Sequence, residues 1–420
     1  MRTGQGTCSL KRAGLGDGLL VTIVKILVSN IGSTSFKFRL FDVSSSGERE
    51  LAGGGADRIG GAGGQMKLVV AGRASEARRD FADHGEAIEA VLAHLAGEGV
   101  LAGAGDLDAV AFKAVVGGGA PPVCEVDDAL IERMERFSPV APAHNPPYVA
   151  AMRQFRRSMP EAKLVATFED GFHADMPDRR KLYACPPAWA EENGVRRYGY
   201  HGASHRWVAR RIGRLMPEAR RIISCHLGGS SSLCAIRDGQ SVATSMGLTP
   251  QSGLPQATRV GDFDAFGLKL MAERTGRGMD DLLAELASGA GLAGVSGTSG
   301  DIRDIEAGVA AGDQRCRLAL DLYVTAARDY LGAYLVELGG ADAVAFTGGI
   351  GQHSPLVRAG VLDGLAFAGI EADADANEAM QEEGRIDSPG SRAAIWVLPA
   401  NEERIVARLA ADFLAANPRT

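Results

Sequence analysis

Two stretches of the chain share one pattern: an apolar run, a small polar turn, and a second apolar run. The first, residues 25–42, reads KILVSNIGSTSFKFRLFD, and the second, residues 221–240, reads RIISCHLGGSSSLCAIRDGQ. Apolar runs on both sides of such a turn predict a β-hairpin, and glycine allows the backbone to turn tightly. The amides and hydroxyls of such a turn can also surround an anion such as phosphate.

The two hairpins indicate an internal duplication. When they are laid over each other, Asn30 falls on His226 and Gly32 on Gly228, an offset of 196 residues from position 30 to position 226. An offset of this length is too long for a solenoid repeat. It favours a duplicated domain, with two phosphate-facing hairpins on either side of a cleft.

Further elements follow from hydrophobic periodicity. Residues 43 to about 80 are Gly-rich and polar, whereas the i, i+3, i+4, i+7 spacing of residues 84–95 predicts an amphipathic helix. Short apolar runs predict buried strands at residues 108–116, 163–168, 342–347 and 395–398. A long helix is predicted at residues 318–338, where two glycines end it, and a terminal helix follows residue 403.

Several polar residues next to these elements are candidates for chemistry. Lys113 lies inside a predicted buried strand, so it is either at an edge or directed at an anion. Glu169 and Asp170 follow a strand at its carboxyl end, where ligands of open α/β sheets bind, unless they are a solvated pair. His144 is placed in a rigid, proline-bounded loop, and Arg259 lies in the loop at residues 249–264. Arginine suits two-point binding of carboxylate or phosphate.

Three other segments add to these candidates. Residues 198–205, YGYHGASH, hold two histidines at a spacing that is a thin basis for a metal site. Asp301 is predicted to cap the helix that follows it. The Gly-rich residues 348–351 are predicted to form a loop after a strand, where a nucleotide can approach the backbone. This is not a Walker A loop, because the chain contains no Gly-Lys dipeptide.

Composition narrows the class of protein. The chain has 420 residues, which suggests two or three domains, and its net charge of −7 argues against a nucleic-acid surface. We expect no membrane partner, since no run is long enough to span a bilayer. Six scattered cysteines without a CxxC pair fit reduced thiols in the cytoplasm. Residues 1–21 do not fit a secretory signal and are expected to be a disordered tail.

Taken together, the motifs resemble the acetate kinase family over residues 24 to about 410. The stretches that carry the resemblance, in order, are KILVSNIGSTSFKF, PAHNPP, FEDGFH, YGYHGASH, CHLGGSSS, MGLTPQSGL with Thr258-Arg259, GVSGTSGDIRD, AFTGGIGQHS and PANEE. The resemblance implies an α/β fold of two duplicated ribonuclease-H-like domains of the actin-like ATPase superfamily, with a cleft between them. We predict an N-terminal domain at residues 22–170, completed by residues 404–420, and a nucleotide-binding C-terminal domain at residues 171–403.

The resemblance also implies a reaction and its site. The family transfers the γ-phosphoryl group of ATP to a short carboxylate, reversibly, with Mg²⁺ or Mn²⁺, and it is homodimeric. The implied catalytic residues are Glu169, His201, Arg259 and His144, and the implied metal ligands are Asn30 and Glu402. The implied substrate-binding residues are Lys113, Val115, Tyr200, Pro250 and Ala143. The implied nucleotide-binding residues are Ser33, Ser35, Lys37, His226, Gly228, Gly229, Ser230, Asp301, Ile302, Arg303, Gly349, Ile350 and Gly351.

The sequence departs from the family pattern at five of these positions. Lys113 replaces an arginine, which keeps the charge but loses the two-point fork. Glu169 replaces an aspartate, and Gly229 replaces an asparagine whose amide would contact phosphate. Ala143 replaces a leucine and Tyr200 a phenylalanine, so the substrate pocket is expected to be larger and more polar.

These departures leave more than one function open. The first hypothesis is a kinase of short carboxylates, with propionate or a hydroxy acid as an alternative to acetate. A second is a nucleotide-binding sensor with weak turnover, which would bind ATP without forming an acyl phosphate. A sugar kinase is disfavoured by PAHNPP and YGYHGASH, and a pyrophosphate-dependent variant by the small residues at Gly349-Ile350.

Overall fold

The computed structural model describes residues 12–13, 21–32, 34–138 and 145–418. The chain divides into two compact units: unit 1 is Met1–Gly171 with Glu402–Thr420, and unit 2 is Phe172–Asn401. The predicted domain boundaries lie at residues 170/171 and 403/404. Whether each unit folds as an independent domain stays a prediction.

Unit 1 is built on an eight-stranded sheet with strand order β7-β6-β5-β4-β3-β8-β10-β9. The predicted first hairpin is confirmed: β3 (Val24–Ile31) pairs antiparallel with β4 (Ser35–Ser44). The predicted buried strands are β8 (Ala109–Ala114) and β10 (Lys163–Phe168), and β8 pairs in parallel with both β3 and β10. The short edge strand β9 (Val123–Glu125) completes the sheet.

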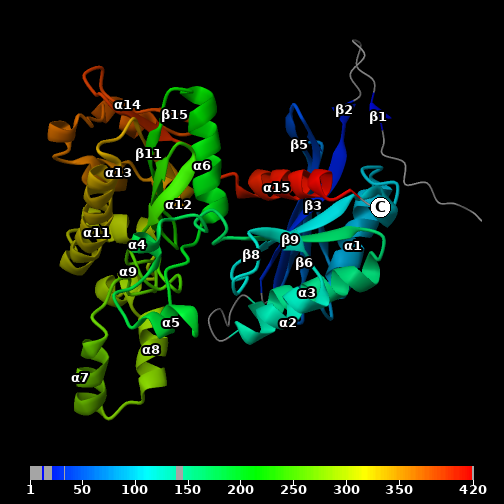
Figure 1. Ribbon diagram of the computed structural model, residues 1–420, viewed down its shortest axis with the longest axis horizontal. Helices are drawn as coiled ribbons and strands as arrows, with labels where there is room; N and C mark the ends of the chain where they lie inside the picture. Colours follow the sequence, from blue (N-terminus) through cyan, green and yellow to red (C-terminus); the bar gives the residue numbers. More distant parts are fainter. Residues whose placement is uncertain (1–11, 14–20, 33, 139–144, 419–420) are drawn as a thin grey trace, which may run out of the picture. The chain divides into compact units, whose positions relative to one another are not determined.

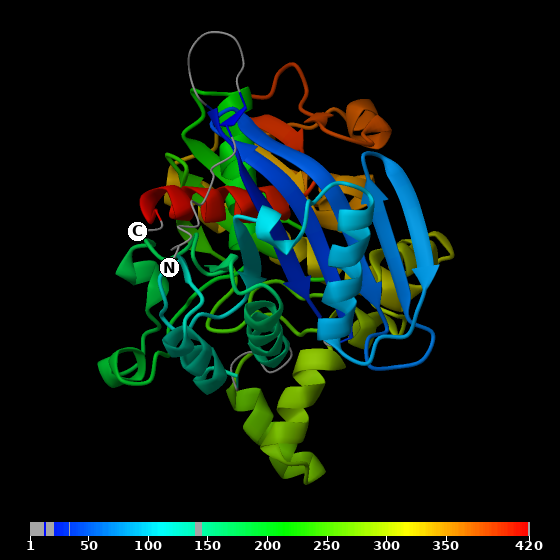
Figure 2. The same cartoon turned by 90° about the vertical axis from the view of Figure 1, so that its right-hand side faces the viewer.

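The polar stretch after the first hairpin forms three more antiparallel strands, which the hydrophobic pattern did not reveal. These are β5 (Gly47–Asp57), β6 (Gln65–Val70) and β7 (Arg73–Arg78), drawn in lighter blue in Figure 2. Every residue of β7 is exposed, so no apolar alternation marks it as a strand. A side chain at Gly54 or Gly55 would lie within 2.2 Å of a backbone oxygen of the neighbouring strand, which explains the glycines in β5.

Helices cover both faces of this sheet (Figure 1). The predicted helix α1 (His84–Gly97) and α3 (Asn145–Ser158) pack on one face, around Phe36, Phe112 and Phe155. The terminal helix α15 (Glu402–Ala416) lies on the other face against β3, β4, β8 and β10. The unit also contains α2 (Asp128–Arg136), η1 (Ala104–Asp106) and the strand pair β1 (Arg12–Ala13) and β2 (Val21–Thr22).

Unit 2 repeats the strand arrangement of unit 1. Its six-stranded sheet has the order β13-β12-β11-β14-β16-β15. The second predicted hairpin is confirmed as β11 (Arg221–His226) with β12 (Ser232–Arg237). The other strands are β13 (Gln240–Thr244), β14 (Ala343–Thr347), β15 (Gly384–Arg385) and β16 (Ala394–Val397). Three antiparallel strands followed by two parallel strands occur in both sheets, β5-β4-β3-β8-β10 and β13-β12-β11-β14-β16.

Unit 2 also has helices on both faces of its sheet. The long helix α11 (Gln314–Leu338) packs on one face and ends at the left-handed Gly339 as predicted, whereas α6 (Gly202–Leu215) packs on the other. The remaining helices are α4 (Asp178–Lys181), α5 (Pro187–Glu191), α7 (Phe266–Thr275), α8 (Met279–Ser288), α9 (Gly291–Ser296), α10 (Ile302–Ala310), α12 (Gly348–His353), α13 (Pro355–Leu362), η2 (Ala366–Ala368) and α14 (Ala374–Ala379).

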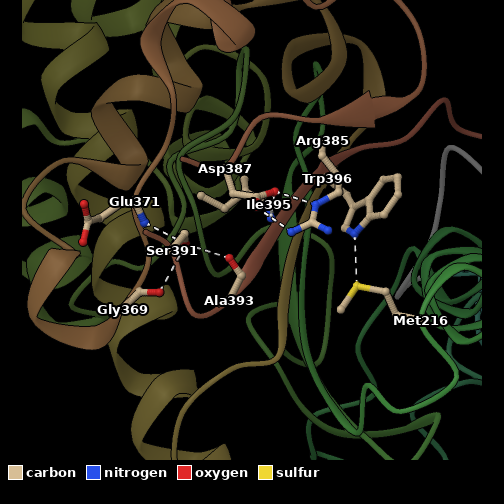
Figure 3. A network of polar contacts seen from close by, with 9 residues as sticks. All are labelled: Met216, Gly369, Glu371, Arg385, Asp387, Ser391, Ala393, Ile395 and Trp396. Carbon is tan, nitrogen blue, oxygen red and sulfur yellow. Dashed lines mark hydrogen bonds and ion pairs between the residues drawn. The ribbon is translucent and has the colours of Figure 1, made fainter. Parts of the chain in front are cut away.

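The β15–β16 edge of this sheet is held by polar contacts (Figure 3). Asp387 Oδ1 accepts hydrogen bonds from Arg385 Nε at 2.9 Å and from the Ile395 amide at 3.1 Å. Ser391 Oγ donates to the Ala393 carbonyl at 2.7 Å, and Trp396 Nε1 contacts Met216 Sδ at 3.4 Å. These contacts join neighbouring segments, so we interpret this network as structural.

Three local predictions require correction. Residues 348–351 are not a loop, because α12 begins at Gly348 directly after β14. Residues 145–147, which belong to the proline-bounded loop predicted around His144, instead form the start of α3, where prolines are tolerated because the first helical amides need no intrahelical acceptor. Glu402 begins α15 instead of preceding it. Of the helices in the described ranges, none is long and apolar enough to span a bilayer.

Candidate active site

Three ionic side chains of unit 1 meet near the ends of its parallel strands. Lys113 on β8 donates from Nζ to Glu402 Oε2 at 2.5 Å, and Glu169 Oε1 lies 4.0 Å from the same nitrogen. The three side chains are 19%, 15% and 8% exposed, respectively. Burial opposes the charge on Lys113, but Glu402 and Glu169 outweigh it and raise the pKa of the ammonium. The sequence left two interpretations of Lys113: a residue at a sheet edge or a residue directed at an anion. The structure supports the second, and the anions are the carboxylates of Glu402 and Glu169.

Next to this ionic cluster, a tyrosine fixes the amide of Asn30. Tyr148 on α3 donates its hydroxyl to Asn30 Oδ1 at 3.0 Å. Burial raises the pKa of Tyr148 to about 12, and nearby Lys113 opposes that shift. Tyr148 was not among the predicted site residues, although it directly follows the proline pair of the PAHNPP motif. Its contact with Asn30 spans 118 residues, so no local pattern could reveal it.

The first hairpin places two predicted nucleotide-binding residues near Asn30. Ser35 begins β4 and its carbonyl accepts from the Gly32 amide at 2.9 Å, which closes the turn. Lys37, exposed on β4, lines a cavity of about 530 Å³ together with Asn30 and Glu403. Val115 follows β8 and is partly exposed. Ser33, Ala143 and His144 lie outside the described residues.

The donor atoms of unit 1 suit a hard divalent cation. Asn30 offers an amide oxygen and Glu402 a carboxylate, and magnesium binds such oxygens together with water and phosphate. No group of three or more His, Cys, Asp or Glu side chains in the described ranges has the arrangement of a metal site. Magnesium does not need one, because one or two carboxylates and the phosphates of a substrate suffice.

In unit 2, two predicted site histidines lie side by side. The His201 and His226 ring centroids are 4.2 Å apart, and the two residues come from the start of α6 and the end of β11. His201 precedes α6 with a left-handed backbone, φ 57° and ψ 28°. Such a conformation is uncommon for a residue with a side chain and occurs often at functional sites.

Each of these histidines has a serine partner. His226 Nδ1 is 2.7 Å from Ser204 Oγ, and His201 Nδ1 is 2.8 Å from Ser232 Oγ. Ser232 Oγ is also 2.8 Å from His205 Nε2, and His205 Nδ1 is 2.9 Å from Ser224 Oγ. Ser232, His205 and Ser224 are fully buried. None of these three was predicted as a catalytic or binding residue, and His205 was considered only as half of a weak metal-binding pair with His201.

Arg259 is held by a glutamine that the sequence analysis also missed. Arg259 Nη1 donates to Gln256 Oε1 at 3.1 Å and to Ser230 Oγ at 3.3 Å, while Ser230 Oγ donates to Gln256 Oε1 at 2.7 Å. Gln256 Nε2 donates to the Pro250 carbonyl at 2.7 Å. The structure therefore joins Arg259, Ser230 and Pro250, which come from three parts of the motif pattern, through one buried amide. Burial lowers the pKa of Arg259.

Of the two glycines in the turn of the second hairpin, Gly229 has open space beside it and Gly228 does not. A side chain at Gly229 would meet no atom within 4 Å, and one at Gly228 would lie 3.3 Å from the Ser230 carbonyl. The Ile350 and Gly351 amides donate to the Leu227 carbonyl at 2.9 and 3.0 Å. These two amides are thus engaged within unit 2, while Gly349 is exposed beside them.

The predicted helix cap at Asp301 is confirmed. Asp301 Oδ1 accepts from the Arg303 amide at 2.9 Å, and Arg303 Nη2 donates to Asp301 Oδ2 at 2.7 Å. The hydrogen bond from the Arg303 side chain lowers the pKa of Asp301 to about 2. Ile302 is buried, so this turn of α10 presents the Asp301–Arg303 pair to solvent.

Tyr200 is buried, and its hydroxyl is used within unit 2. It donates to the Leu248 carbonyl at 2.5 Å. The expectation that this hydroxyl makes the substrate pocket more polar is therefore weakened. A separate cavity of about 880 Å³, lined by α7, α8, α9 and α11, includes none of the predicted site residues.

The structure thus gathers the predicted residues by unit. Unit 1 brings together Asn30, Lys113, Glu169 and Glu402, and unit 2 brings together His201 with His226 and Arg259 with Ser230. The partly buried charges cluster in unit 1, whereas unit 2 supplies Arg259, the Asp301–Arg303 pair at the solvent-facing turn of α10, and serines and histidines joined by hydrogen bonds.

Comparison with known proteins places this arrangement in a class. A crystal structure of acetate kinase from Porphyromonas gingivalis matches with a TM-score of 0.85 at 33% identity, covering 93% of this chain and all of that one. A propionate kinase from Francisella tularensis matches with a TM-score of 0.84 at 28% identity, covering 92% and 98%. The protein therefore has the duplicated actin-like ATPase fold, and the predicted fold class is confirmed.

The family follows from the sequence comparisons. The acetokinase family profile matches residues 25–408. An acetate kinase from Shouchella clausii is 36% identical over 390 residues, which are 92% of this chain and 98% of that protein. The chain belongs to the acetokinase family, whose activity is ATP-dependent phosphorylation of acetate with a divalent metal.

Proposed function

We propose that this protein transfers the γ-phosphoryl group of ATP to the carboxylate of a short acid, reversibly, forming an acyl phosphate and ADP. The observation that carries this proposal is the family match over residues 25–408. The sequence motifs, by their resemblance to the family, assign Asn30, His201, Arg259 and Glu402 to its metal and catalytic positions. The assigned roles below are proposals supported by the geometry of each unit.

Unit 1 is proposed to hold the acid and the metal. An ammonium has three N–H donors, and Lys113 uses one of them toward Glu402. The other two suit the oxygens of a substrate carboxylate. Glu402 and Asn30 would hold Mg²⁺ or Mn²⁺, which when bound offsets the negative charge of the phosphates. Tyr148 keeps the Asn30 amide oriented for this task.

Unit 2 is proposed to stabilise the phosphoryl group during transfer. The transition state of phosphoryl transfer carries its charge on the equatorial oxygens, so positioned cations and N–H donors supply most of the catalysis. Arg259 brings a guanidinium held by Gln256, and His201 brings a ring held by Ser232. The second hairpin, with Asp301 and residues Gly349 and Ile350 at the start of α12, is proposed to bind ATP. Glu169 and His144 keep their proposed supporting roles.

The family match does not identify the preferred acid. The similarity to a propionate kinase from Francisella tularensis gives a specific reason to test propionate beside acetate. The replacement of a family leucine by Ala143 points in the same direction, because a smaller side chain leaves room for additional carbons. We propose acetate as the reference substrate and propionate as the first alternative.

Hydroxylamine trapping of the acyl phosphate tests this proposal. Purified protein is incubated with Mg-ATP and formate, acetate, propionate, butyrate, glycolate or lactate, and the hydroxamate is measured. We expect a signal with acetate or propionate that disappears without Mg²⁺ and is strongly reduced in Arg259→Ala. No hydroxamate with any acid, together with measurable ATP binding, would overturn the kinase proposal and favour the nucleotide sensor.

Assembly and location are proposed from the family resemblance. We propose a homodimer that works in the cytoplasm. Sedimentation equilibrium at micromolar concentration measures the assembly state, and a monomer throughout that range would contradict the first part.

A further inference from the structure

Four side chains of unit 2 form a continuous line of hydrogen bonds that ends at His201. The line runs from Ser224 through His205 and Ser232 to His201, with successive distances of 2.9, 2.8 and 2.8 Å. Ser224 lies on β11, Ser232 on β12, His205 on α6, and His201 is the residue that precedes α6. A serine hydroxyl and a neutral imidazole each have one proton and also accept, so the direction of each bond sets the next.

The middle of this line is neutral. His205 is fully buried, and burial, with the nearby rings of His173 and His226, lowers its pKa well below the usual value. A neutral ring carries its proton on one nitrogen only. His205 therefore donates toward either Ser224 or Ser232 and accepts from the other.

The buried end of the line decides between the two directions. Within the described part of the chain, His205 Nδ1 is the hydrogen-bond partner of the Ser224 hydroxyl. If Nδ1 carried the proton, the Ser224 hydroxyl proton would be buried without an acceptor, which is costly. The Ser224 hydroxyl therefore donates to Nδ1, and the His205 proton lies on Nε2.

We propose that this line fixes the proton of neutral His201 on Nε2. His205 Nε2–H donates to Ser232 Oγ, so the Ser232 hydroxyl must donate to His201 Nδ1. His201 then presents an N–H at Nε2, not a lone pair. Given the proposed kinase function, that N–H is the donor which meets the transferring phosphoryl oxygens, and Ser224, His205 and Ser232 are positioning residues for it.

A second serine–histidine pair in unit 2 provides a matched control. His173 Nδ1 is 2.7 Å from Ser241 Oγ, and His173 Nε2 is 3.1 Å from the Tyr200 carbonyl. Because a carbonyl only accepts, His173 Nε2 donates to it and Nδ1 accepts from the Ser241 hydroxyl, so this pair has its own fixed direction. Ser241→Ala therefore removes a comparably buried hydroxyl whose hydrogen-bond partners, His173 and Cys234, are not members of the line.

The test is ¹⁵N NMR of histidine-labelled protein at pH 8, where the two ring nitrogens report protonation separately. The His201 signals are assigned by their loss in His201→Gln. We expect wild-type His201 to be protonated on Nε2. We expect Ser232→Ala and Ser224→Ala to shift His201 toward a mixture of tautomers, and Ser241→Ala to leave it unchanged. Protonation of wild-type His201 on Nδ1 would overturn the proposal, as would unchanged His201 signals in both Ser232→Ala and Ser224→Ala.

Steady-state kinetics gives a second test, whose outcome is independent of the NMR result. Ser232→Ala is expected to lower kcat about tenfold, the scale of one misdirected hydrogen bond, with the KM for ATP unchanged. Ser232→Cys, which keeps a weak donor, should recover part of this loss. If the wild-type protein forms no acyl phosphate, the kinase proposal fails, while the NMR result still decides the direction of the line.

Discussion

The two units share a strand arrangement but differ in the chemistry at the strand ends. In unit 1, the strand beside the first hairpin carries Lys113, which pairs with Glu402 and lies near Glu169. In unit 2, the hairpin and α6 carry serines and histidines joined by hydrogen bonds, and the central ring, His205, is held neutral by burial. Asn30 in unit 1 and His226 in unit 2 mark the same position of the repeat.

Under the proposed function, this difference would let one duplicated backbone serve two tasks. Partly buried charges need partners of opposite sign, and in unit 1 Lys113 pairs with Glu402 and lies near Glu169. We propose that these side chains exchange partners with an acid and a metal. In the serine–histidine line of unit 2, the direction of each hydrogen bond instead determines which ring nitrogen carries the proton. The repeated apolar pattern specifies the sheet, and only a few polar positions specify the chemistry.

The largest expected effect is on metal binding by unit 1. Glu402→Gln removes the carboxylate charge at the start of α15 and is expected to weaken Mn²⁺ binding in the presence of ADP by about a hundredfold, since even indirect partners of a metal matter tenfold or more. Electron paramagnetic resonance of free Mn²⁺ measures it. Glu403→Gln, in the same helical turn, is the control and should bind Mn²⁺ as the wild type does. Equal weakening in both variants would remove Glu402 from the proposed metal site.

Acid should destabilise the protein through the histidines of unit 2. Burial lowers the pKa of His173 to about 4, so between pH 6.5 and 4 the unfolded chain binds a proton that the folded chain does not. The free energy of unfolding is therefore highest, as far as His173 is concerned, above pH 6.5. It decreases as the pH falls, by about 2 kcal/mol at pH 5. Urea unfolding at pH 7.5 and pH 5 measures this loss. In His173→Gln the loss should be smaller by a similar amount, and an unchanged difference between the two pH values would contradict the assignment to His173.

A more conservative change sharpens the role of the cation in unit 1. Lys113→Arg restores a two-point fork and is expected to lower the KM for acetate by up to about tenfold, the scale of one additional charged hydrogen bond. Steady-state hydroxamate assays measure it, with Lys37→Arg on β4 as the comparison. An unchanged KM for every acid would indicate that Lys113 serves the carboxylates of unit 1 only.

The smallest expected effect concerns the second hairpin. A side chain at Gly229 meets no atom within 4 Å, so Gly229→Asn should leave the melting temperature unchanged. The added amide is expected to lower the KM for ATP about threefold, which corresponds to a neutral hydrogen bond. Thermal unfolding and initial rates measure the two parts. A raised KM for ATP would show that this open space is needed by the nucleotide.

Sequence reasoning reached the hairpins because their apolar and polar positions are local. The strands β5, β6 and β7 were not predicted. Their glycines and charged residues give no clear alternation of apolar and polar positions, and every residue of β7 is exposed. Sequence reasoning also assigned a loop where α12 begins, because a run of glycines usually indicates a turn. Such regions are determined by pairing with a neighbouring strand, and no local pattern contains that pairing.

The candidate site shows the same limit. The resemblance supplied Lys113 and Glu402 as separate residues, but their contact joins positions 289 residues apart. Tyr148, Gln256 and Ser232 were missed because each acts through a distant partner that is visible only in the fold. Their residue types are common in cores and loops, so only the hydrogen bonds reveal what they do.

Steady-state kinetics of Lys113→Met and Ser232→Ala test the comparison of the two units most directly. The two variants are measured side by side, with acetate and ATP varied in turn. The account predicts that Lys113→Met raises the KM for acetate while the KM for ATP stays near the wild-type value. It predicts that Ser232→Ala lowers kcat with both KM values little changed. If both variants change the same constants, the proposed division of tasks between the charged cluster of unit 1 and the serine–histidine line of unit 2 is wrong.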